Sequence, residues 1–296
     1  MGRIAPLVAA LLLAAAPGTV AGRVATGVEP DGLAVGAGAV WAADTGDTTV
    51  TRIDLSTHRA RRLRAGPGPI AVAVTPTAIA AADYAGSTVT FLSPATGKAL
   101  GRVSTGPKPV GLAWTGRALW VVNQGDGSIA VVDPATRRVT ARLRGVAGAG
   151  FAAYGDGSVW VPSFEGASTV VRWDPATQHP VATIRVGKLP VEVAFGAGSV
   201  WVVNGMSSTV SRIDPATNRV VATIHVHGAP TGIAFAHGKV WVASITANDV
   251  SAIDPATNRL GGSIGGIVSP RDIAPVGTDL WVAAFAESDV ALIKLR

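Results

Sequence analysis

Cysteine is missing from all 296 positions of the sequence. Its absence excludes disulfides, zinc sites built on thiolates, cysteine nucleophiles and iron–sulfur clusters. Charged residues are also few, at 15% of the chain, whereas hydrophobic residues make up 48%. This balance supplies ample material for a core and differs from the composition of a disordered chain. The 36 glycines and 19 prolines favour many turns, and hence short strands rather than long helices.

Long hydrophobic runs are missing after the N-terminus, since no later stretch reaches the roughly 18 uninterrupted apolar residues of a transmembrane helix. The N-terminus itself has Arg3, an apolar run over residues 4–16, and small residues at Thr19 and Ala21. This order is typical of a secretory signal peptide cleaved after Ala21, with a retained anchor as the alternative. We therefore expect residues 1–21 to be a signal peptide, the protein to be secreted or extracytoplasmic, and no membrane span to remain after cleavage.

One short phrase recurs along the rest of the chain, for example "SRIDPATNRVVATI" from Ser211 and "SAIDPATNRL" from Ser251. The Asp of this phrase, used as a ruler, marks steps of 39, 40, 41, 40, 40 and 40 residues. The positions in this column are Asp54, Ser93, Asp133, Asp174, Asp214, Asp254 and Lys294. Seven copies with strand-like content and a period near forty residues are typical of a β-propeller.

Each copy predicts four short strands, labelled a to d from the axis outward. A Pro opens strand a, a Gly-containing turn precedes strand b, a polar loop leads to strand c, and the Asp-Pro-Ala-Thr turn joins c to d. The chain ends on a strand c at 290–295, while an unmatched strand-d phrase begins at Gly22. We therefore expect an all-β, seven-bladed β-propeller of four-stranded antiparallel blades over 22–296. The N-terminal strand would complete the last blade and remove a free edge.

Three columns of the repeat have structural explanations. Asp and Pro suit the c–d turn, and Asn218 and Asn258 stand where a left-handed conformation is needed. A Trp begins strand b in six copies and is expected to fill the gap between sheets, with a sugar-binding platform as the alternative. These residues are Trp41, Trp120, Trp160, Trp201, Trp241 and Trp281. A small residue four positions after the Pro column suits the crowded axis, and its positions are Ala34, Ala73, Ala113, Ala153, Ala194, Ala234 and Ala274.

Units of the form P-x-G-I-A-F…G-x-V-W-V-x-N…T-V-S-x-I-D-P-A-T-N resemble the YVTN-type, YncE-like propellers. They are also similar in scaffold to the streptogramin (virginiamycin B) lyases. The resemblance covers the whole chain after residue 21 and implies the propeller fold, but propellers host many unrelated functions. The lyase resemblance implies a divalent metal, His and Glu groups for proton abstraction, and a Glu three residues after Trp. Because no copy has Glu or His in that column, we expect a protein that is not an enzyme, with a divalent-metal-dependent lyase as the alternative.

The d–a and b–c loops are expected to surround the channel mouth at one end of the ring, where a binding site is predicted. The b–c loops begin with mostly polar residues, although Asp and Asn are also ordinary loop formers. Two positions after the Pro column, most copies have Gly or Ala, but Glu192 and Asp272 stand there in two copies. This column lies beside the axis, where burying a charge is costly unless it is paired. An ion pair between Asp31 and Arg271 is expected across the ring closure. The candidate ligand-binding residues are Asp44, Asp83, Asn123, Glu192, Asn204, Arg271 and Asp272, and no catalytic residue is assigned.

Metal binding is left open by the sequence. Asp44 with Asp47, and Asn123 with Asp126, offer the oxygen ligands that Mg²⁺ or Ca²⁺ prefers, but neither group is a complete loop motif. The net charge of +6 comes with basic clusters on strands d and no interleaved aromatics for base stacking, so no specific nucleic-acid binding is expected. We therefore expect a secreted, monomeric, non-enzymatic binding or scaffold propeller. Its partner at the mouth would be a small molecule, a glycan or a protein.

Overall fold

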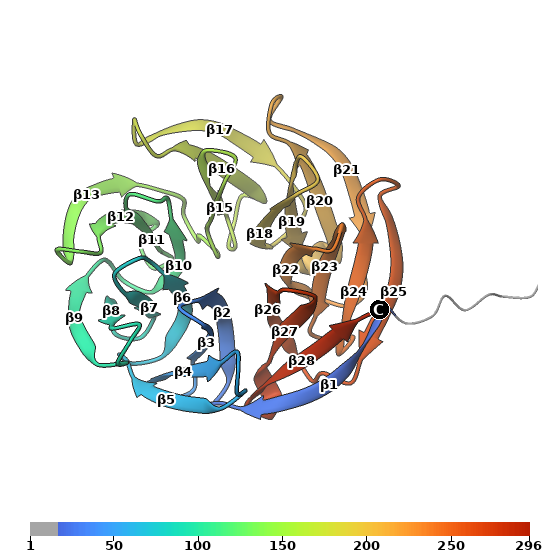
Figure 1. Ribbon diagram of the computed structural model, residues 1–296. Coiled ribbons are helices and arrows are strands. Elements are labelled where there is room, and N and C mark those ends of the chain that lie inside the picture. Colours follow the sequence, from blue (N-terminus) through green and yellow to red (C-terminus); the bar gives the residue numbers. More distant parts are fainter. Residues whose placement is uncertain (1–16) are drawn as a thin grey trace, which may run out of the picture.

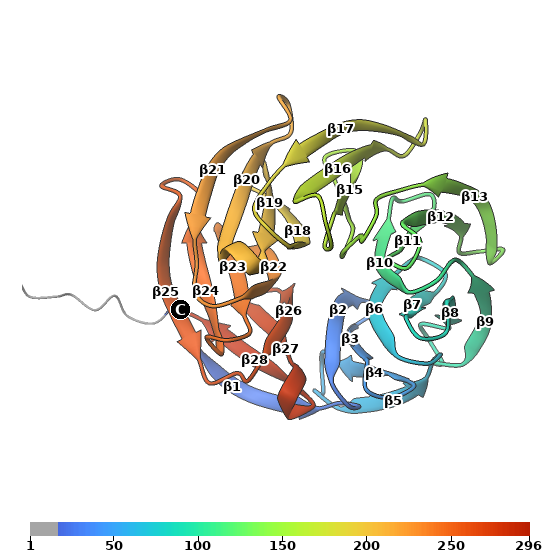
Figure 2. The same cartoon turned by 180° about the vertical axis from the view of Figure 1, so that it is seen from behind.

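The computed structural model describes residues 17–296, so most of the predicted signal peptide lies outside the described residues. Seven four-stranded antiparallel sheets surround a central axis, as predicted (Figure 1). Figure 2 shows the same ring from behind, with the inner strands converging on the axis. Within the described range, no helix is long and apolar enough to cross a bilayer.

The blades are numbered here in chain order, and each is given from strand a to strand d. Blade 1 consists of β2 (Pro30–Gly36), β3 (Ala39–Asp44), β4 (Thr49–Asp54) and β5 (Ala60–Arg64). Blade 2 consists of β6 (Pro69–Val74), β7 (Ile79–Asp83), β8 (Thr88–Leu92) and β9 (Ala99–Ser104). Blade 3 consists of β10 (Pro109–Trp114), β11 (Leu119–Asn123), β12 (Ser128–Asp133) and β13 (Arg138–Arg144). Blade 4 consists of β14 (Ala153–Gly155), β15 (Ser158–Pro162), β16 (Thr169–Asp174) and β17 (His179–Arg185).

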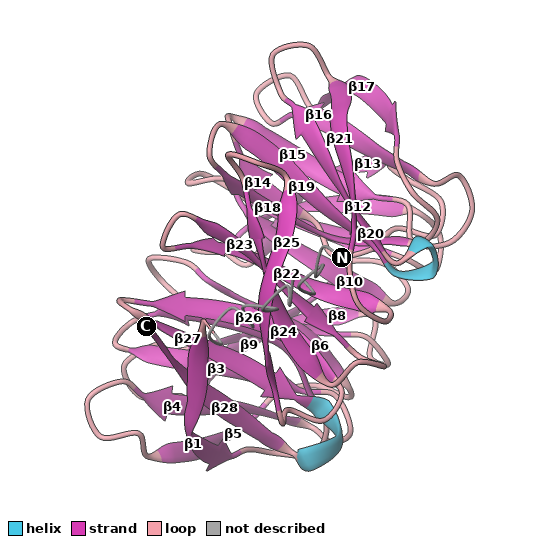
Figure 3. Cartoon of the chain, turned by 90° about the vertical axis from the view of Figure 1, so that its right-hand side faces the viewer, coloured by secondary structure: helices cyan, strands magenta, loops and turns pink. Residues whose placement is uncertain are grey.

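Blade 5 consists of β18 (Pro190–Gly196), β19 (Ser199–Asn204), β20 (Thr209–Asp214) and β21 (Arg219–His225). Blade 6 consists of β22 (Pro230–Ala236), β23 (Lys239–Ser244), β24 (Asp249–Asp254) and β25 (Arg259–Gly265). Blade 7 is β26 (Pro270–Val276), β27 (Asp279–Ala284), β28 (Asp289–Leu295) and β1 (Gly18–Ala25). Two short 3-10 turns, η1 (Gly205–Ser207) and η2 (Phe285–Glu287), lie in b–c loops. Figure 3 shows both on the same side of the ring, which is the side of the predicted mouth.

Strand β1 closes the ring by pairing antiparallel with β28. The prediction that the N-terminal strand completes the last blade is thereby confirmed (Figure 1). The strand begins at Gly18 rather than at Gly22, and Gly18 lies opposite Leu295 in the register. Its first four residues therefore belong to the predicted signal peptide. Cleavage after Ala21 would leave only the second half of this strand.

The tryptophan column fills the space between blades. All six side chains are 2% exposed or less. The indole of Trp41 donates a hydrogen bond to the Gly36 carbonyl at 3.0 Å, and that of Trp201 donates to Gly196 at the same distance. Burial with a satisfied N–H is the pattern of a core aromatic rather than of an exposed sugar platform. The expectation that these residues form the core is therefore confirmed.

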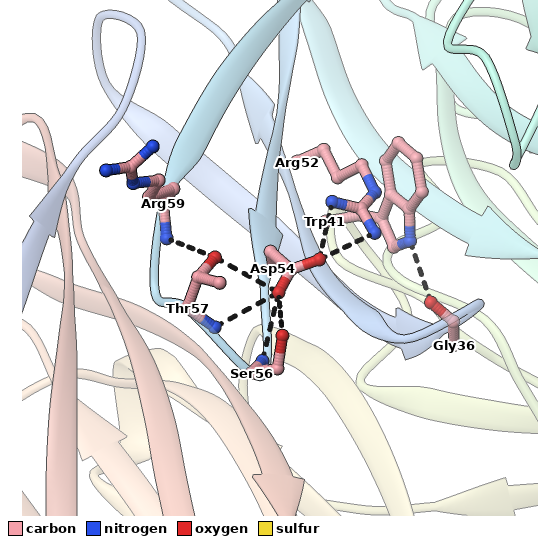
Figure 4. A network of polar contacts seen from close by, with 7 residues as sticks. All are labelled: Gly36, Trp41, Arg52, Asp54, Ser56, Thr57 and Arg59. Carbon is pink, nitrogen blue, oxygen red and sulfur yellow. Dashed lines mark hydrogen bonds and ion pairs between the residues drawn. The ribbon is translucent and has the colours of Figure 1, made fainter.

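The c–d turn is a hydrogen-bond network centred on the Asp of the repeated phrase (Figure 4). In the first copy, Asp54 Oδ1 accepts hydrogen bonds from the backbone N–H groups of Ser56 at 3.0 Å and Thr57 at 3.1 Å. Its Oδ2 lies 3.1 Å from Arg52 Nη2. These interactions, led by the bond from the Ser56 hydroxyl, lower the pKa of Asp54 well below its ordinary value. The repeated phrase is therefore explained by turn formation.

The Asn that ends the phrase joins neighbouring blades. Asn258 adopts the left-handed conformation, with φ of 57°. Its Oδ1 accepts a hydrogen bond of 2.9 Å from Nη1 of Arg212 in the preceding blade. The Arg212 guanidinium also lies over the Trp201 ring, 4.9 Å from its centroid. Arg172 makes the same contact with Asn218 one blade earlier, so the turn residue also fixes the packing between blades.

Removing this contact should loosen blades 5 and 6. We expect Arg212→Ala to lower the free energy of unfolding by about 2 kcal/mol, because charge-assisted hydrogen bonds and a stacking contact are lost. Asn258→Gly alone should cost about 1 kcal/mol, since it removes one hydrogen bond and Gly readily adopts the left-handed conformation of this position. The double variant should cost less than the sum of the two changes. Urea titration of the four proteins measures this coupling, and additive effects would contradict it.

Candidate functional site

Four of the predicted site residues, those that begin the b–c loops, are buried structural groups. Asp44, Asp83, Asn123 and Asn204 are all 0% exposed. The Oδ2 atom of Asp44 accepts hydrogen bonds from the hydroxyls of Thr49 at 2.7 Å and Thr51 at 2.8 Å. Asp83 makes the equivalent bonds with two threonines of β8. These side chains hold their loops in place, and none of them lines the axial pocket described below.

The first residue of each of these b–c loops packs directly against a glycine in the preceding d–a loop. A Cβ added to Gly27 would lie 2.5 Å from the carboxyl carbon of Asp44, and equivalent glycines lie over Asp83, Asn123 and Asn204. Blade 6 instead carries the smaller Ser244, and there the glycine position is occupied by His227. A side chain is therefore tolerated in the d–a loop where the loop-anchoring residue is small.

The variant Gly27→Ala should destabilise the fold. Because the new methyl group overlaps the Asp44 carboxyl, we expect a loss of about 2 kcal/mol in the free energy of unfolding. The matched control is Gly265→Ala, since a Cβ there meets nothing within 4 Å and the backbone needs no positive φ. That control should be nearly neutral. Thermal and urea unfolding measure both variants, and equal stabilities would contradict the steric argument.

The two groups considered as cation ligands already serve the loop backbone. Asp47 Oδ1 accepts a hydrogen bond from the Thr49 N–H at 2.7 Å, and Asp126 Oδ1 accepts one from the Ser128 N–H at 2.9 Å. Across residues 17–296, no three His, Asp or Glu side chains lie close enough together to share a metal ion. The described residues therefore do not assemble the donor set that the lyase resemblance implies.

A pocket of about 360 Å³ opens at the mouth of the axis. Most of its lining comes from two parts of the repeat, namely the first two residues after the strand-a Pro column and the second residue of the b–c loop. Much of the wall is apolar or aromatic, and it includes Tyr84, Phe151, Phe164, Leu189, Val191 and Ile245. The charged groups of the lining are Asp31 on β2, Glu192 on β18, and Arg271 and Asp272 on β26. Three of the predicted site residues are thus brought together here, with Asp31 beside them.

Glu192 and Asp272 each bind the backbone of the next blade. Asp272 Oδ2 accepts a hydrogen bond of 2.6 Å from the Leu33 N–H, and Glu192 Oε2 accepts one of 3.2 Å from the Ile233 N–H. The charge of Asp272 also contributes to the raised pKa of Glu192. With these backbone partners, both groups remain beside the axis at lower cost than isolated charges.

Burial raises the pKa of all three pocket carboxyls. Removal from water raises the pKa of Asp31 to about 7, against the opposing effect of the Arg271 charge. The pKa of Asp272 rises to about 6 for the same reason, although backbone N–H groups oppose the change. Burial, reinforced by the charge of Asp272, raises the pKa of Glu192 well above its ordinary value. The cluster therefore retains protons near neutral pH, where ordinary carboxyls are ionised.

The expected ion pair between Asp31 and Arg271 is not formed. Within residues 17–296 neither side chain has a hydrogen bond or a direct ion pair, although the Arg271 charge lowers the pKa of Asp31 through space. The guanidinium carbon of Arg271 instead lies 4.3 Å from the ring centroid of Phe285, on the b–c loop of the same blade. Stacking on this ring holds Arg271 beside the pocket without neutralising it.

The predicted site residues Asp44, Asp83, Asn123 and Asn204 are the first residues of their b–c loops, whereas the second residues of these loops contribute more to the pocket. The register explains the difference, since the first residue lies opposite the strand-a Pro, as Asp44 does opposite Pro30, and is enclosed within the blade. A signal was present in the next column, whose residues vary from Gly to aromatic side chains where a purely structural position would be uniform. Its residues are Thr45, Tyr84, Gln124, Phe164, Gly205, Ile245 and Phe285.

No family model matches the sequence, and no curated protein does either. Solved structures share its fold. A streptogramin B lyase structure has 17% identity and a TM-score of 0.77, covering 94% of this chain and 97% of that one. Virginiamycin B lyase from Staphylococcus aureus has 14% identity and a TM-score of 0.79, covering 91% and 96%. A chain of a mitotic checkpoint complex has 14% identity and a TM-score of 0.84, covering 100% and 97%.

At such identities these likenesses show the fold alone. The chain is a seven-bladed β-propeller similar in structure to virginiamycin B lyase. The resemblance of its repeats to YVTN-type propellers remains a prediction.

Proposed function

We propose that the protein is a non-enzymatic, ligand-binding β-propeller whose axial pocket binds a small organic molecule. The observation that carries this proposal is a local departure from the repeat. Three inner strands direct Asp31, Glu192, Arg271 and Asp272 into the pocket, at positions where most copies have Gly, Ala, Val or Ile. Small-molecule sites of this size are typically apolar, with a few convergent polar groups.

The energetics of these residues also support a functional role. A buried carboxyl with a raised pKa reduces the stability of the fold at neutral pH, because its ionised form loses hydration. The scaffold does not need such groups, since the corresponding strand-a positions of blades 2 and 3 are filled by apolar residues and Gly. Strained or destabilising groups are commonly retained where ligands bind.

Thermal-shift screening against a diverse set of small organic molecules tests the proposal. Compounds that bind the folded state raise the melting temperature in a concentration-dependent way. Their effect should be lost in Ile70→Trp, because the larger ring would fill the pocket that Ile70 lines. The control Val181→Trp alters an exposed position on outer strand β17 and should respond as the unmodified protein does. The absence of any stabilising compound, or equal shifts in both variants, would contradict the proposal.

Export is part of the proposed function. An N-terminal Arg followed by an apolar run supports it. Expression with the full N-terminus should deliver the protein outside the cytoplasm, and N-terminal sequencing of that material would identify the cleavage point. A start at Gly22 would agree with the predicted processing, whereas recovery of full-length protein only from the cytoplasm would contradict export.

Lyase activity is the second candidate, favoured by the structural similarity to the two lyases. No convincing acid–base pair with the implied metal donors can be named among the described residues, which is why binding is preferred. Incubation of the purified protein with a streptogramin B and Mg²⁺, followed by chromatography coupled to mass spectrometry, decides between the two. An unchanged substrate mass cannot by itself reveal isomeric ring opening, so chromatography of the product is needed as well. Ring opening above a no-protein control would overturn the non-enzymatic proposal.

A further inference from the structure

The pocket contains an acidic group, Asp31, and a basic group, Arg271, and neither has a direct partner among the described protein groups. Asp31 is 9% exposed, and within residues 17–296 its carboxyl has no hydrogen bond or ion pair. Arg271 is held on Phe285, and its buried Nε likewise has no hydrogen-bond partner among the described residues. Buried polar groups in folded proteins are normally paired, so the buried Asp31 carboxyl and the buried Nε of the half-buried Arg271, both without direct partners in one pocket, point to a ligand-binding site.

Each of these groups selects a different ligand group. An unpaired carboxylate accepts hydrogen bonds from an ammonium, which is a compact donor of three hydrogens. A guanidinium offers a planar fork that matches a carboxylate in a bidentate arrangement. One ligand that carries both groups would satisfy Asp31 and Arg271 together without adding net charge to the pocket.

The rest of the lining indicates what else the ligand contains. Phe151 and Phe164 line the pocket from blade 4, where strand a is shortened to the three residues of β14. Leu189, Val191 and Ile245 extend the apolar lining. Such a surface favours an aromatic or branched aliphatic group. The volume of about 360 Å³ suits a molecule of this size rather than a bare ion.

We propose that the ligand of the axial pocket is a small zwitterion with an apolar side group, such as an apolar amino acid or a closely related amphoteric molecule. The inference rests on the proposed binding function and adds the chemical class of the ligand. The ammonium is bound by Asp31, with Asp272 nearby, and the carboxylate is bound by Arg271. The apolar group packs against the side of the pocket that contains Phe151 and Phe164.

Other ligand classes satisfy only part of this arrangement. A simple amine can pair with Asp31, but it leaves the Arg271 guanidinium without a carboxylate partner. A simple carboxylic acid meets repulsion from Asp31 and Asp272, because three carboxyl groups and one guanidinium line the pocket. A metal ion lacks a suitable set of donors, since no three acidic or His side chains among the described residues are placed to share one.

Isothermal titration calorimetry at pH 8 with three matched probes tests the proposal. L-phenylalanine carries both charged groups, phenethylamine lacks the carboxylate, and 3-phenylpropionate lacks the ammonium. We expect L-phenylalanine to bind the unmodified protein at least about tenfold more tightly than either analogue, because one charge-assisted hydrogen-bond pair is lost in each. Equal affinities for L-phenylalanine and one analogue, or no binding of any probe, would overturn the inference.

Two variants assign the charged groups. Arg271→Gln should reduce the affinity for L-phenylalanine to about that for phenethylamine, and Asp31→Asn should reduce it to about that for 3-phenylpropionate. If either variant fails to fold, the comparison of the three probes on the unmodified protein still decides the outcome. Suppose that a screening compound lacks the ammonium, the carboxylate or both, and that its stabilising effect is lost in Ile70→Trp. This result would overturn the proposal of a zwitterionic ligand while leaving the binding function intact. The absence of any hit at all would contradict both.

Discussion

A chain that begins at Thr26, and therefore lacks β1, is expected to lose its cooperative native fold. Seven register pairs join β1 to β28, and Val20 and Val24 on β1 pack against the buried cores at this part of the ring. Their removal leaves blade 7 with three strands and exposes the edge of β28. The lost pairing and burial are comparable with the roughly 5–15 kcal/mol by which a whole domain is stable. Circular dichroism and size-exclusion chromatography measure the loss.

Two longer chains serve as controls for this truncation. A chain that begins at Gly18 keeps all of β1 and should unfold cooperatively. A chain that begins at Gly22, the predicted mature terminus, keeps four of the seven register pairs and should have intermediate stability. Native-like stability of the chain that begins at Thr26 would contradict closure by β1.

The variant Asp31→Asn is expected to be more stable than the unmodified protein at pH 8. Burial raises the pKa of Asp31 from 3.8 to about 7, so the folded state holds this proton over a range in which the unfolded chain has released it. The folded state binds more protons than the unfolded state between about pH 4 and 7, and stability due to this group falls as pH rises through that window. A shift of about three units corresponds to roughly 4 kcal/mol. Asn cannot ionise and avoids this loss.

The difference in the free energy of unfolding between Asp31→Asn and the unmodified protein reports on Asp31 alone, because the other carboxyls with raised pKa values are present in both. It should be small at pH 4 and should grow to a few kcal/mol by pH 8, as measured by urea titration across this range. Asp54→Asn supplies a control of opposite sign. Because hydrogen bonds lower the pKa of Asp54, its contribution to stability is present above about pH 4 and is lost in acid. A destabilised Asp31→Asn at pH 8 would mean that the carboxylate has a structural partner.

The fold could be predicted from the sequence because its determinants are local and repeated. The Asp54 turn, the Trp41 position and the forty-residue spacing each occur several times, so a single irregular copy does not obscure them. Ring closure was also predictable, since the chain ends on a strand c and only the N-terminus supplies a further strand. The start of β1 at Gly18 was not predicted, because the signal-peptide pattern and the strand overlap in the same residues.

The site was only partly predictable, because its residues do not repeat. Glu192 and Asp272 stood out as charged exceptions in a column of small residues. Asp31 was predicted only as the structural ion-pair partner of Arg271, and that prediction is wrong. Arg271 stacks on Phe285 instead, which depends on the path of one b–c loop that the repeat does not determine. Asp44 and the equivalent loop residues do not line the pocket. The sequence could not place them, because buried loop anchors and pocket-lining residues draw on the same polar side chains.

A crystal structure of the protein with its tightest-binding small molecule tests the central claim most directly. We expect electron density for the compound inside the axial pocket, with polar groups facing Asp31 and Arg271 and an apolar group against Phe151. Density on the outer strands with an empty pocket would contradict the assignment of the axial pocket as the functional site.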